Sequence, residues 1–245
     1  MTKPPVLILG ARSDIGKAVA YKFAALGHPI QLAARNASAL EADKADIELR
    51  YGAPVSLHEF DALATDTHEA FVAGLPELPR IAVCAIGLMG QQAENQIDVA
   101  AAARVMRSNF EGPASILAIL ANRFEERGSG SIAGISSVAG DRGRATNYLY
   151  GSAKAGFTAF LSGLRNRLAK RGVHVVTVLP GFVATQMTEG MNLPAKLTAE
   201  PSEVADAIAR AVDRKKDVIY VRPIWRLIML IIRNIPEILF KNIKM

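Results

Sequence analysis

The sequence predicts a single α/β domain in which a doubly wound sheet of seven parallel strands carries helices on both faces. Short apolar runs alternate with helix-length amphipathic segments along the chain, which is the rhythm of βαβ units. Several runs, such as 81–83 and 175–178, are almost continuously apolar, as strands buried on both faces are. The 245 residues, half of them hydrophobic, suffice for one buried core and do not require a second domain.

The elements can be assigned in order from the N-terminus. The apolar run Val6–Leu9 predicts the first strand, and a helix is expected over about Asp14–Leu26. The other strands are expected at Ile30–Ala34, Val55–Phe60, Ile81–Ala85, Ser131–Ser136, His174–Leu179 and Val218–Val221, each after a helical stretch. Ligands of such sheets bind beyond the carboxyl ends of the strands, so the residues that follow each strand are candidates for a site.

Glycines and polar residues directly follow six of the seven predicted strands. They are Gly10–Gly16, Arg35, Asp61, Gly87, Ser137 and Pro180–Gly181. Parallel strands end at one edge of the sheet, so we expect these residues to lie along a single edge. Glycines and polar residues would not be expected after so many strands by chance, so the pattern indicates a binding site at this edge.

The loop after the first strand predicts a site for a dinucleotide pyrophosphate. It reads Gly10-Ala11-Arg12-Ser13-Asp14-Ile15-Gly16 and leads into the first helix. Glycines permit a tight turn and a close approach of the backbone, and the helix N-terminus attracts a phosphate. A plain glycine turn is the alternative interpretation.

The end of the second strand indicates which dinucleotide binds. An acidic residue there would accept hydrogen bonds from the ribose 2′-hydroxyl, but this chain has Arg35 and Asn36, and an arginine pairs with a 2′-phosphate. Arg12 adds a second positive group, so the sequence favours NADPH over NADH; surface solubility is the alternative role of both arginines. Asp61 and Ala62, after the third strand, are expected either to hold the adenine amino group or to cap the next turn.

Tyr150-Gly-Ser-Ala-Lys154 predicts a proton-transfer site. On a helix the two side chains lie one turn apart on the same face, and Ser137 precedes the tyrosine by thirteen residues. A free phenol has a pKa of roughly 10, and a close ammonium favours the phenolate and lowers that pKa. Tyr148 lacks a lysine partner because residue 152 is serine. A solvated lysine beside a half-buried tyrosine is the alternative interpretation.

Composition excludes several other kinds of site. The single cysteine, Cys84, rules out an internal disulfide and a cysteine-rich zinc site, and it fits a reducing cytosol. Four scattered histidines offer no metal-ligand spacing, so no metal is expected. The chain opens without a signal-peptide pattern. It also shows no basic module with interleaved aromatics, so we expect no nucleic-acid partner.

The net charge of +6 belongs to the C-terminal segment. Residues 1–213 hold 21 basic and 21 acidic side chains, whereas 214–245 hold eight basic against two acidic ones. The eight are Arg214, Lys215, Lys216, Arg222, Arg226, Arg233, Lys241 and Lys244. From 222 onward the chain alternates apolar residues with cations and includes Trp225, a composition typical of an interfacial membrane helix. It is too short to span a bilayer, which needs roughly 20 apolar residues; a helix packed on the domain or across a dimer is the alternative.

Taken together, these motifs resemble the short-chain dehydrogenase/reductase family over about 5–221. The matching motifs are Gly10-x-x-x-Asp14-x-Gly16, Asn109-Phe-Glu-Gly112, Ser136-Ser137, Tyr150-x-x-x-Lys154 and Pro180-Gly181-Phe-Val183-Ala-Thr185. The resemblance implies a Rossmann-like, NAD(P)-dependent oxidoreductase that interconverts ketones and alcohols.

The resemblance also implies roles for the site residues. Tyr150 would be the proton donor, Lys154 would lower its pKa and hold the ribose, and Ser137 would hydrogen-bond the substrate oxygen. Asn109 would support a water relay behind Lys154, and Thr185 would hold the nicotinamide amide. Pro180, Gly181 and Val183 of the same turn, with Gly87, complete the expected cofactor contacts.

Two positions depart from the family pattern. The middle glycine of the loop is Asp14, which preserves the turn only if its backbone has negative φ, and which adds charge near the pyrophosphate. The family's Asn-Asn-Ala-Gly after the fourth strand is Cys84-Ala85-Ile86-Gly87 here, which removes side chains that brace that strand and leaves only the contact of the glycine with the adenosine side of the cofactor. We interpret Cys84 as a buried filler of the core.

The segment 137–144 leads from the serine to the tyrosine, so Arg142 and Arg144 are expected near the mouth of the substrate site, where they could clamp a phosphate; exposed loop arginines are the alternative. A lid at about 181–200 carries apolar side chains that either cover an apolar substrate or pack the lid on the domain. These are Met187, Met191, Leu193 and Leu197.

Within the family, the 137–144 and 147–154 stretches and the tail look most like the keto-reductase of the decaprenylphosphoryl-ribose 2′-epimerase system. That resemblance implies NADPH-dependent reduction of a keto sugar on a polyprenyl phosphate. The alternatives are a soluble ketoreductase for acyl or small carbonyl substrates, and a non-catalytic NADP-binding sensor or scaffold.

The organisation expected is a catalytic domain over 1–221 and a basic apolar tail over 222–245. The family resemblance implies a homodimer or homotetramer formed through the long helices. The expected location is the cytoplasm, with the inner face of the cytoplasmic membrane as the variant in which the tail binds lipid.

Overall fold

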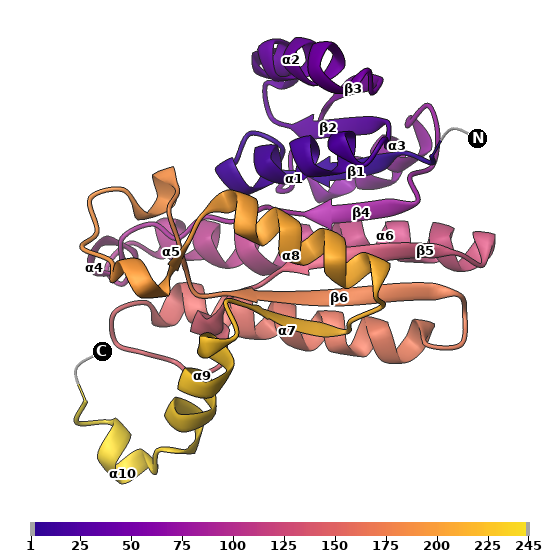
Figure 1. Ribbon diagram of the computed structural model, residues 1–245. Coiled ribbons are helices and arrows are strands. Elements are labelled where there is room, and N and C mark those ends of the chain that lie inside the picture. The colour runs from indigo at the N-terminus through magenta and orange to yellow at the C-terminus, as the bar shows by residue number, and fades with distance from the viewer. Residues whose placement is uncertain (1–2, 244–245) are drawn as a thin grey trace.

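The computed structural model describes residues 3–243, and one sheet organises it. All seven strands are parallel, in the order β3-β2-β1-β4-β5-β6-β9, which confirms the predicted sheet (Figure 1). The strands are β1 (Val6–Leu9), β2 (Ile30–Ala34), β3 (Val55–Glu59), β4 (Ile81–Cys84), β5 (Gly130–Ile135), β6 (Val173–Pro180) and β9 (Val218–Val221). Three of them have the predicted bounds, β3 and β4 end one residue earlier than predicted, and β5 and β6 differ by one residue at both ends.

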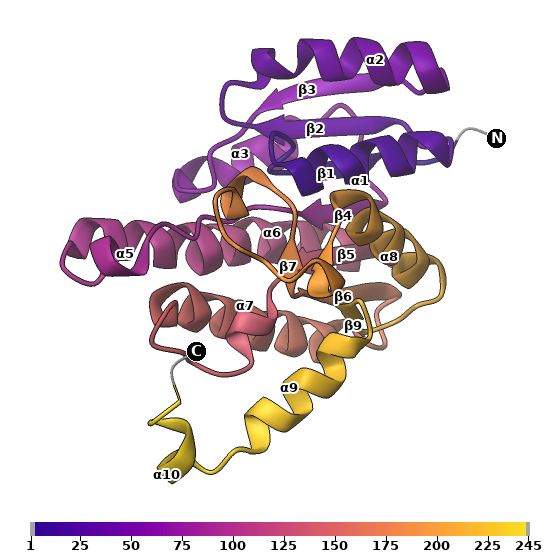
Figure 2. The same ribbon diagram turned by 60° about the vertical axis from the view of Figure 1, so that its left-hand side comes forward.

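Helices cover both faces of the sheet, as predicted (Figures 1 and 2). One face carries α1 (Asp14–Ala25), α2 (Glu41–Tyr51) and α8 (Pro201–Asp213), and the other carries α3 (His68–Ala73), α6 (Gly112–Arg127) and α7 (Tyr148–Leu168). Val6 and Ile8 of β1 pack on the first layer and Leu7 and Leu9 on the second. This alternation of side chains accounts for the continuous apolar runs.

The strand order places a crevice beyond the carboxyl ends of β1 and β4. The chain moves outward from β1 to β2 and β3, then returns to β4 on the other side of β1. Loops from the two halves separate at this switch point and leave room for a ligand. The small helices α4 (Gln92–Asn95) and α5 (Val99–Met106) follow β4 on this side, before the π-helical turn η3 (Arg107–Glu111).

A lid extends from the end of β6. It contains the two-residue strands β7 (Phe182–Val183) and β8 (Thr198–Ala199), which pair with each other, and the short helical turns η5 (Gln186–Thr188) and η6 (Ala195–Leu197). Figure 2 shows this lid between the first half of the sheet and the C-terminal helix.

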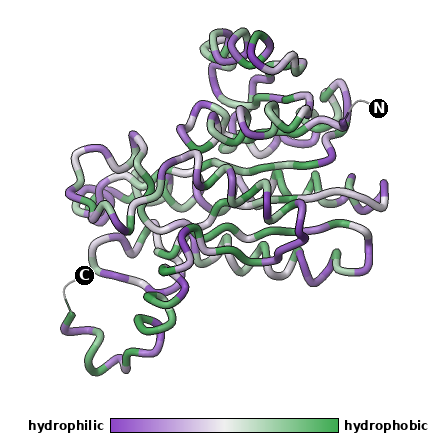
Figure 3. The backbone as a smooth tube through the Cα atoms, viewed as in Figure 1, coloured by the Kyte–Doolittle hydropathy of each residue, from purple (hydrophilic) through white to green (hydrophobic). Residues whose placement is uncertain are grey.

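The C-terminal segment folds back on the domain. It consists of α9 (Ile224–Asn234) and α10 (Glu237–Phe240), and Trp225 and Met229 on one side of α9 are buried. Apolar residues also lie on its outer side, where Leu227, Leu230 and Ile231 are more than half exposed, and the tube is largely hydrophobic there (Figure 3). Within residues 3–243 no helix has the length and hydropathy needed to cross a membrane. The predicted tail cation Lys244 lies outside the described residues.

Candidate active site

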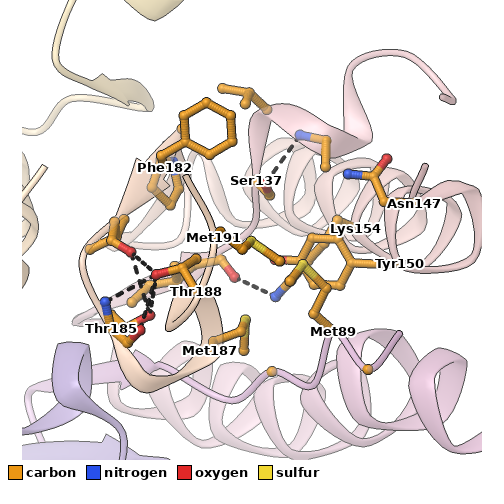
Figure 4. Close-up of a pocket in the computed structure, with 18 of the residues that line it drawn as sticks. Met89, Ser137, Asn147, Tyr150, Lys154, Phe182, Thr185, Met187, Thr188 and Met191 are labelled. Atoms are coloured by element: carbon orange, nitrogen blue, oxygen red, sulfur yellow. Dashed lines mark hydrogen bonds between the residues drawn. The ribbon is translucent and has the colours of Figure 1, made fainter. Parts of the chain in front are cut away.

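A cavity of about 1120 Å³ opens at the carboxyl edge of the sheet. The start of α1, the loop after β4, the end of β5, the first turns of α7 and the lid line it. Figure 4 shows Ser137, Tyr150 and Lys154 together in this cavity, with Met89 and Met191 beside the phenol and Met187 farther away, toward Thr185. The residues that follow separate strands in the sequence therefore meet in one place.

The glycine loop makes a tight turn whose geometry requires glycine at two positions. Gly10 has φ +83°, and a Cβ on Gly16 would lie 2.5 Å from the Gly10 carbonyl oxygen. The Ser13 hydroxyl caps α1 by accepting from the Gly16 amide at 3.0 Å. Ser13, Asp14 and Ile15 line the cavity, so the N-terminus of α1 is available to an anion there.

The backbone of Asp14 has the negative φ that the turn requires of a residue other than glycine. It opens α1 with right-handed helical backbone, and it is not among the residues with positive φ. Its carboxylate accepts from the Gln186 amide in the lid at 2.8 Å. The charge expected near the pyrophosphate thus also ties the lid to the glycine loop.

Arg12 and Arg35 lie together beyond the ends of β1 and β2. Both side chains are exposed, and the Arg12 guanidinium donates to the Arg35 carbonyl at 3.2 Å. Asn36 adopts the left-handed conformation, and the Glu59 carboxylate accepts from the amides of Asn36 and Ala37, which lowers the pKa of that carboxyl. Neither arginine forms an ion pair within residues 3–243. A phosphate would meet two guanidinium groups at this corner that are not held in ion pairs by the described residues.

Asp61 and Gly87 have different surroundings. The Asp61 carboxylate accepts from the Leu63 amide at 2.9 Å, the turn-capping role that the sequence left open. Ala62 packs closely against the start of α6 at Gly112. Gly87 lines the cavity, and a Cβ on it would lie 3.2 Å from the Asn109 amide oxygen and 3.6 Å from the Lys154 ammonium.

Asn109 is fully buried in the π-helical turn η3. Its Nδ2 donates to the Leu88 and Val105 carbonyls, and its Oδ1 accepts from the Leu88 amide at 3.2 Å. It therefore braces the loop after β4 against the helix layer, directly behind Gly87. π-helical turns of this kind are frequent at functional sites.

Lys154 projects from α7 into the sheet edge and is 2 % exposed. Its ammonium donates to the Ile135 carbonyl at 2.9 Å and to the Ile86 carbonyl at 3.5 Å. Burial lowers its pKa to about 8. Neighbouring Cys84 is fully buried, and burial raises its pKa to about 11, so the interpretation of this thiol as a core filler is confirmed.

Tyr150 differs from the expectation in its ionisation. Its pKa is raised to about 12, because the desolvation of the phenolate outweighs the lowering by a hydrogen bond with Ser137. The Lys154 ammonium lies 5.8 Å from the centroid of the phenol ring and is directed at main-chain carbonyls. The predicted lowering of the Tyr150 pKa by Lys154 is therefore wrong for this structure, because the ammonium donates to main-chain carbonyls instead.

The lid brings the proline-glycine turn to the cavity. Pro180, Gly181, Val183 and Thr185 all line it, as do Met187 and Met191, which are each more than a third exposed. Thr185 caps the short turn η5 with Thr188. Leu193 and Leu197 do not line this cavity; Leu197 instead packs in a small core beneath α9.

Arg142 is not at the mouth of the cavity, so the prediction that it clamps a phosphate there is wrong. Its guanidinium caps the C-terminal end of α9, donating to the carbonyls of Ile232 at 2.8 Å and Ile235 at 2.5 Å. It also pairs with Glu237 at 2.8 Å and stacks 3.7 Å from the centroid of the Phe240 ring. These contacts engage both terminal nitrogens of the guanidinium.

Trp225 is a wall of the cavity that the sequence motifs did not identify. Its ring lies so close to Gly181 that a Cβ on that glycine would overlap it, and its Nε1 donates to the Leu197 carbonyl at 3.1 Å. The chain contains a single tryptophan, two residues after Pro223 in the tail, and this was the signal that the sequence offered. The tail is thus part of the site.

Comparisons with known proteins agree with this geometry. A family model described as short chain dehydrogenase matches residues 5–196. An uncharacterized oxidoreductase of Mycobacterium tuberculosis is 41% identical over 97% of this chain and 96% of its own length. A 3-oxoacyl-[acyl-carrier-protein] reductase of Synechocystis is 30% identical over 85% of this chain and 88% of its own length. The structure of a short-chain dehydrogenase from Sphingobium yanoikuyae in complex with NADPH superposes with a TM-score of 0.80 at 25% identity, covering 96% of this chain and 97% of that one.

Proposed function

Because the chain belongs to the short-chain dehydrogenase/reductase family and is therefore an oxidoreductase, we propose that it reduces a keto group with NADPH. One observation carries the proposal. The hydroxyl of Ser137, the phenol of Tyr150 and the ammonium of Lys154 meet in the cavity that the glycine loop also lines.

Tyr150 donates the proton in this proposal. With its pKa raised to about 12, the phenol holds its proton at neutral pH, so the proton that a ketone oxygen must receive is in place, and the hydrogen bond with Ser137 acts to lower that pKa. Ser137 holds the same oxygen through its hydroxyl. Asn109 keeps the loop after β4 in place, so that the Lys154 ammonium stays next to Gly87.

The residues present fit a nicotinamide dinucleotide. A bound nicotinamide supplies the hydride. The glycine loop and the N-terminus of α1 would hold the pyrophosphate, and Gly87, Lys154 and Thr185 would hold the nicotinamide half. Asp61 remains the candidate for the adenine amino group.

Preference for NADPH rests on Arg12 and Arg35, whose charges lack carboxylate partners in residues 3–243. Arg35→Ala should weaken the binding of NADPH far more than that of NADH, as measured by fluorescence titration of both cofactors. Equal weakening of the two would contradict a contact with the 2′-phosphate.

Isotope transfer tests the reaction itself. When the protein is given NADPH deuterated at C4 on each face in turn, one of the two samples should place deuterium on the carbinol carbon of the product, as detected by mass spectrometry. A product without deuterium from either sample would contradict hydride transfer to the ketone.

The substrate we propose is a keto sugar linked to a polyprenyl phosphate. The support from this molecule is an apolar surface, the outer face of the tail, formed by Ile224, Leu227, Leu230, Ile231, Ile238 and Leu239. Trp225, on the buried side of the same helix, lines the cavity, so the helix that carries this apolar face also forms a wall of the cavity. The named Synechocystis relative favours a second candidate, a soluble reductase of acyl ketones. Turnover of a short-chain 3-oxoacyl thioester with no turnover of a lipid-linked keto sugar would select that candidate.

We propose that the outer face of the tail binds an anionic lipid surface. The apolar side chains are accompanied by the exposed cations Arg226 and Lys241, a combination that favours lipid with negative headgroups. Removing the tail would also remove Trp225 from the cavity, so substitution is the sharper test.

A triple variant, Leu227→Gln, Leu230→Gln and Ile231→Gln, keeps the buried face of α9 intact. It should lose co-sedimentation with phosphatidylglycerol vesicles that the unchanged protein shows. Equal binding of the two proteins would contradict the lipid contact, and loss of self-association instead would assign the face to a second copy of the chain.

We propose that a homodimer forms through the helix layer of α5 to α7. Met106 and Phe110 are more than a third exposed there. Light scattering should give twice the mass of one chain, and Phe110→Lys should reduce it to that of a monomer. A monomeric mass for the unchanged protein would contradict this proposal.

A further inference from the structure

Three polar groups on the substrate side of the cavity are buried and have no hydrogen-bond partner within residues 3–243. They are Gln92 Nε2, Arg144 Nε and Asn147 Oδ1. All three residues line the cavity that contains Tyr150. Leaving a buried donor or acceptor unsatisfied costs about 1–3 kcal/mol, so three in one cavity indicate that a ligand supplies the missing partners.

The backbone brings these groups together beside the catalytic tyrosine. The Asn147 amide donates to the Arg144 carbonyl at 3.1 Å, which closes a turn immediately before α7. The Gln92 Oε1 accepts from the Leu149 amide at 3.2 Å and so caps the same end of α7 from the other side of the cavity. That contact leaves the Gln92 Nε2 as a free donor.

Arg144 is the charged member of the group. One of its terminal nitrogens donates to the carbonyl of Val138 at 3.5 Å, and Val138 is the residue that follows Ser137. Burial lowers its pKa, and Asp141 acts in the opposite direction without approaching to ion-pair distance among the described residues. A half-buried guanidinium without a carboxylate partner favours an anion that arrives with the substrate.

We propose that Arg144 and Gln92 form an anion subsite, so that the substrate is a ketone carrying a carboxylate or a phosphate. Both residues line the cavity that contains the phenol, and N–H donors of this kind suit the oxygens of either anion. Asn147 Oδ1 is an acceptor, so it takes a hydroxyl of the substrate and not the anion itself. The inference rests on the proposed ketone reduction, and it adds that the ketone bears an anionic group.

Matched pairs of ketones test the subsite. Levulinate and methyl levulinate differ in a carboxylate, and dihydroxyacetone phosphate and dihydroxyacetone differ in a phosphate. Arg144→Gln should lower the ratio of kcat/KM for the anionic member to that for the neutral member by about 10- to 100-fold, the loss expected for a charge-assisted hydrogen bond. The pair that shows the larger change identifies the anion.

Three further variants sharpen the result. Arg144→Lys keeps the charge and should retain part of the preference. Gln92→Glu keeps the acceptor for the Leu149 amide but replaces the donor with a negative oxygen, so it should also lower the ratio. Arg104→Gln, on the exposed side of α5, removes a charge outside the cavity and should leave the ratio as it was. Equal loss for both members of each pair would overturn the subsite.

A binding measurement separates this inference from the reductase function. Levulinate and dihydroxyacetone phosphate are titrated by calorimetry into the protein saturated with NADP⁺, which occupies the other phosphate sites and prevents reduction. Binding by the unchanged protein and its loss in Arg144→Gln would support the subsite even if no ketone were turned over. No binding by the unchanged protein, or equal binding by both, would overturn it.

Discussion

The cofactor end and the tail end of this cavity are built in different ways. At the cofactor end, the backbone makes the site, since Gly10 and Gly16 shape the loop and Ser13 caps the helix within a few residues of one another. At the tail end, side chains form the cavity wall. Arg142 hydrogen-bonds the end of α9, ninety residues away in the sequence, and Trp225 fills the space beside Gly181. The first end is determined locally and the second by contacts between distant parts of the chain.

The two ends differ in whether their features are common to domains of this kind or belong to this chain. A glycine turn on a helix N-terminus binds a pyrophosphate in any such domain. A tryptophan from the tail lines the cavity of this chain, so the tail forms one of the cavity's walls. Substitutions at the tail end should therefore lower the stability of the fold, whereas substitutions at the cofactor end should weaken cofactor binding.

The largest effect on stability is expected at the tail end. Trp225→Ala empties a buried site packed against Val138, Leu179 and Met229, so it should lower the free energy of unfolding by about 3–5 kcal/mol in urea denaturation. Leu230→Ala on the same helix, where the side chain is 60% exposed, should cost less than about 0.5 kcal/mol. Equal costs would mean that α9 does not pack as described.

At the cofactor end, Gly16→Ala should weaken NADPH binding by about 100-fold, which corresponds to about 2.7 kcal/mol. The added Cβ would lie 2.5 Å from the Gly10 carbonyl oxygen and would open the turn. The matched control is Gly163→Ala in α7, where a Cβ meets nothing within 4 Å and should leave NADPH binding unchanged. Near-normal affinity in Gly16→Ala, measured by fluorescence titration, would reject the loop as the pyrophosphate site.

Between the two ends, Lys154 predicts a pH dependence of stability. Its pKa in the folded protein, about 8, lies below the 10.5 of an unperturbed lysine, so the unfolded chain binds more protons between those two values and stability rises with pH. Relative to Lys154→Met, the unchanged protein should gain about 2 kcal/mol between about pH 8 and about pH 10. A parallel pH profile of the two proteins would contradict the burial of a charged ammonium.

The smallest effect is expected at Arg142. Arg142→Lys keeps the charge but loses the fork that caps α9, so the amides of α9 and α10 should lose about 1–2 kcal/mol of protection in hydrogen exchange. Arg226→Lys, an exposed change on the same helix, should leave that protection as it is. Loss of activity in Arg142→Lys without any loss of hydrogen-exchange protection would indicate that Arg142 contacts the substrate.

The sequence predicts the fold and the cofactor end well, because both depend on local patterns. Strands β1, β2 and β9 have the predicted bounds, since each is an apolar run that ends at a turn or polar residue. Asp14 is compatible with the turn because it is already the first residue of α1.

The sequence predicts the substrate end less well, because its contacts join residues far apart. Nothing near Arg142 indicates that its partners are the last carbonyls of α9, and nothing near Gln92 indicates that it caps α7. The pKa of Tyr150 depends on where the Lys154 ammonium points, which spacing along a helix does not determine.

The central claim is that Tyr150 gives its proton to a ketone, and Tyr150→Phe tests it most directly. The rate of NADPH oxidation at saturating ketone should fall by about 1000-fold, within the range of general acid catalysis, while the affinity for NADPH stays within about threefold. Tyr148→Phe, two residues earlier and 41% exposed, should retain the full rate. A Tyr150→Phe protein that keeps more than about a tenth of the rate would contradict the account.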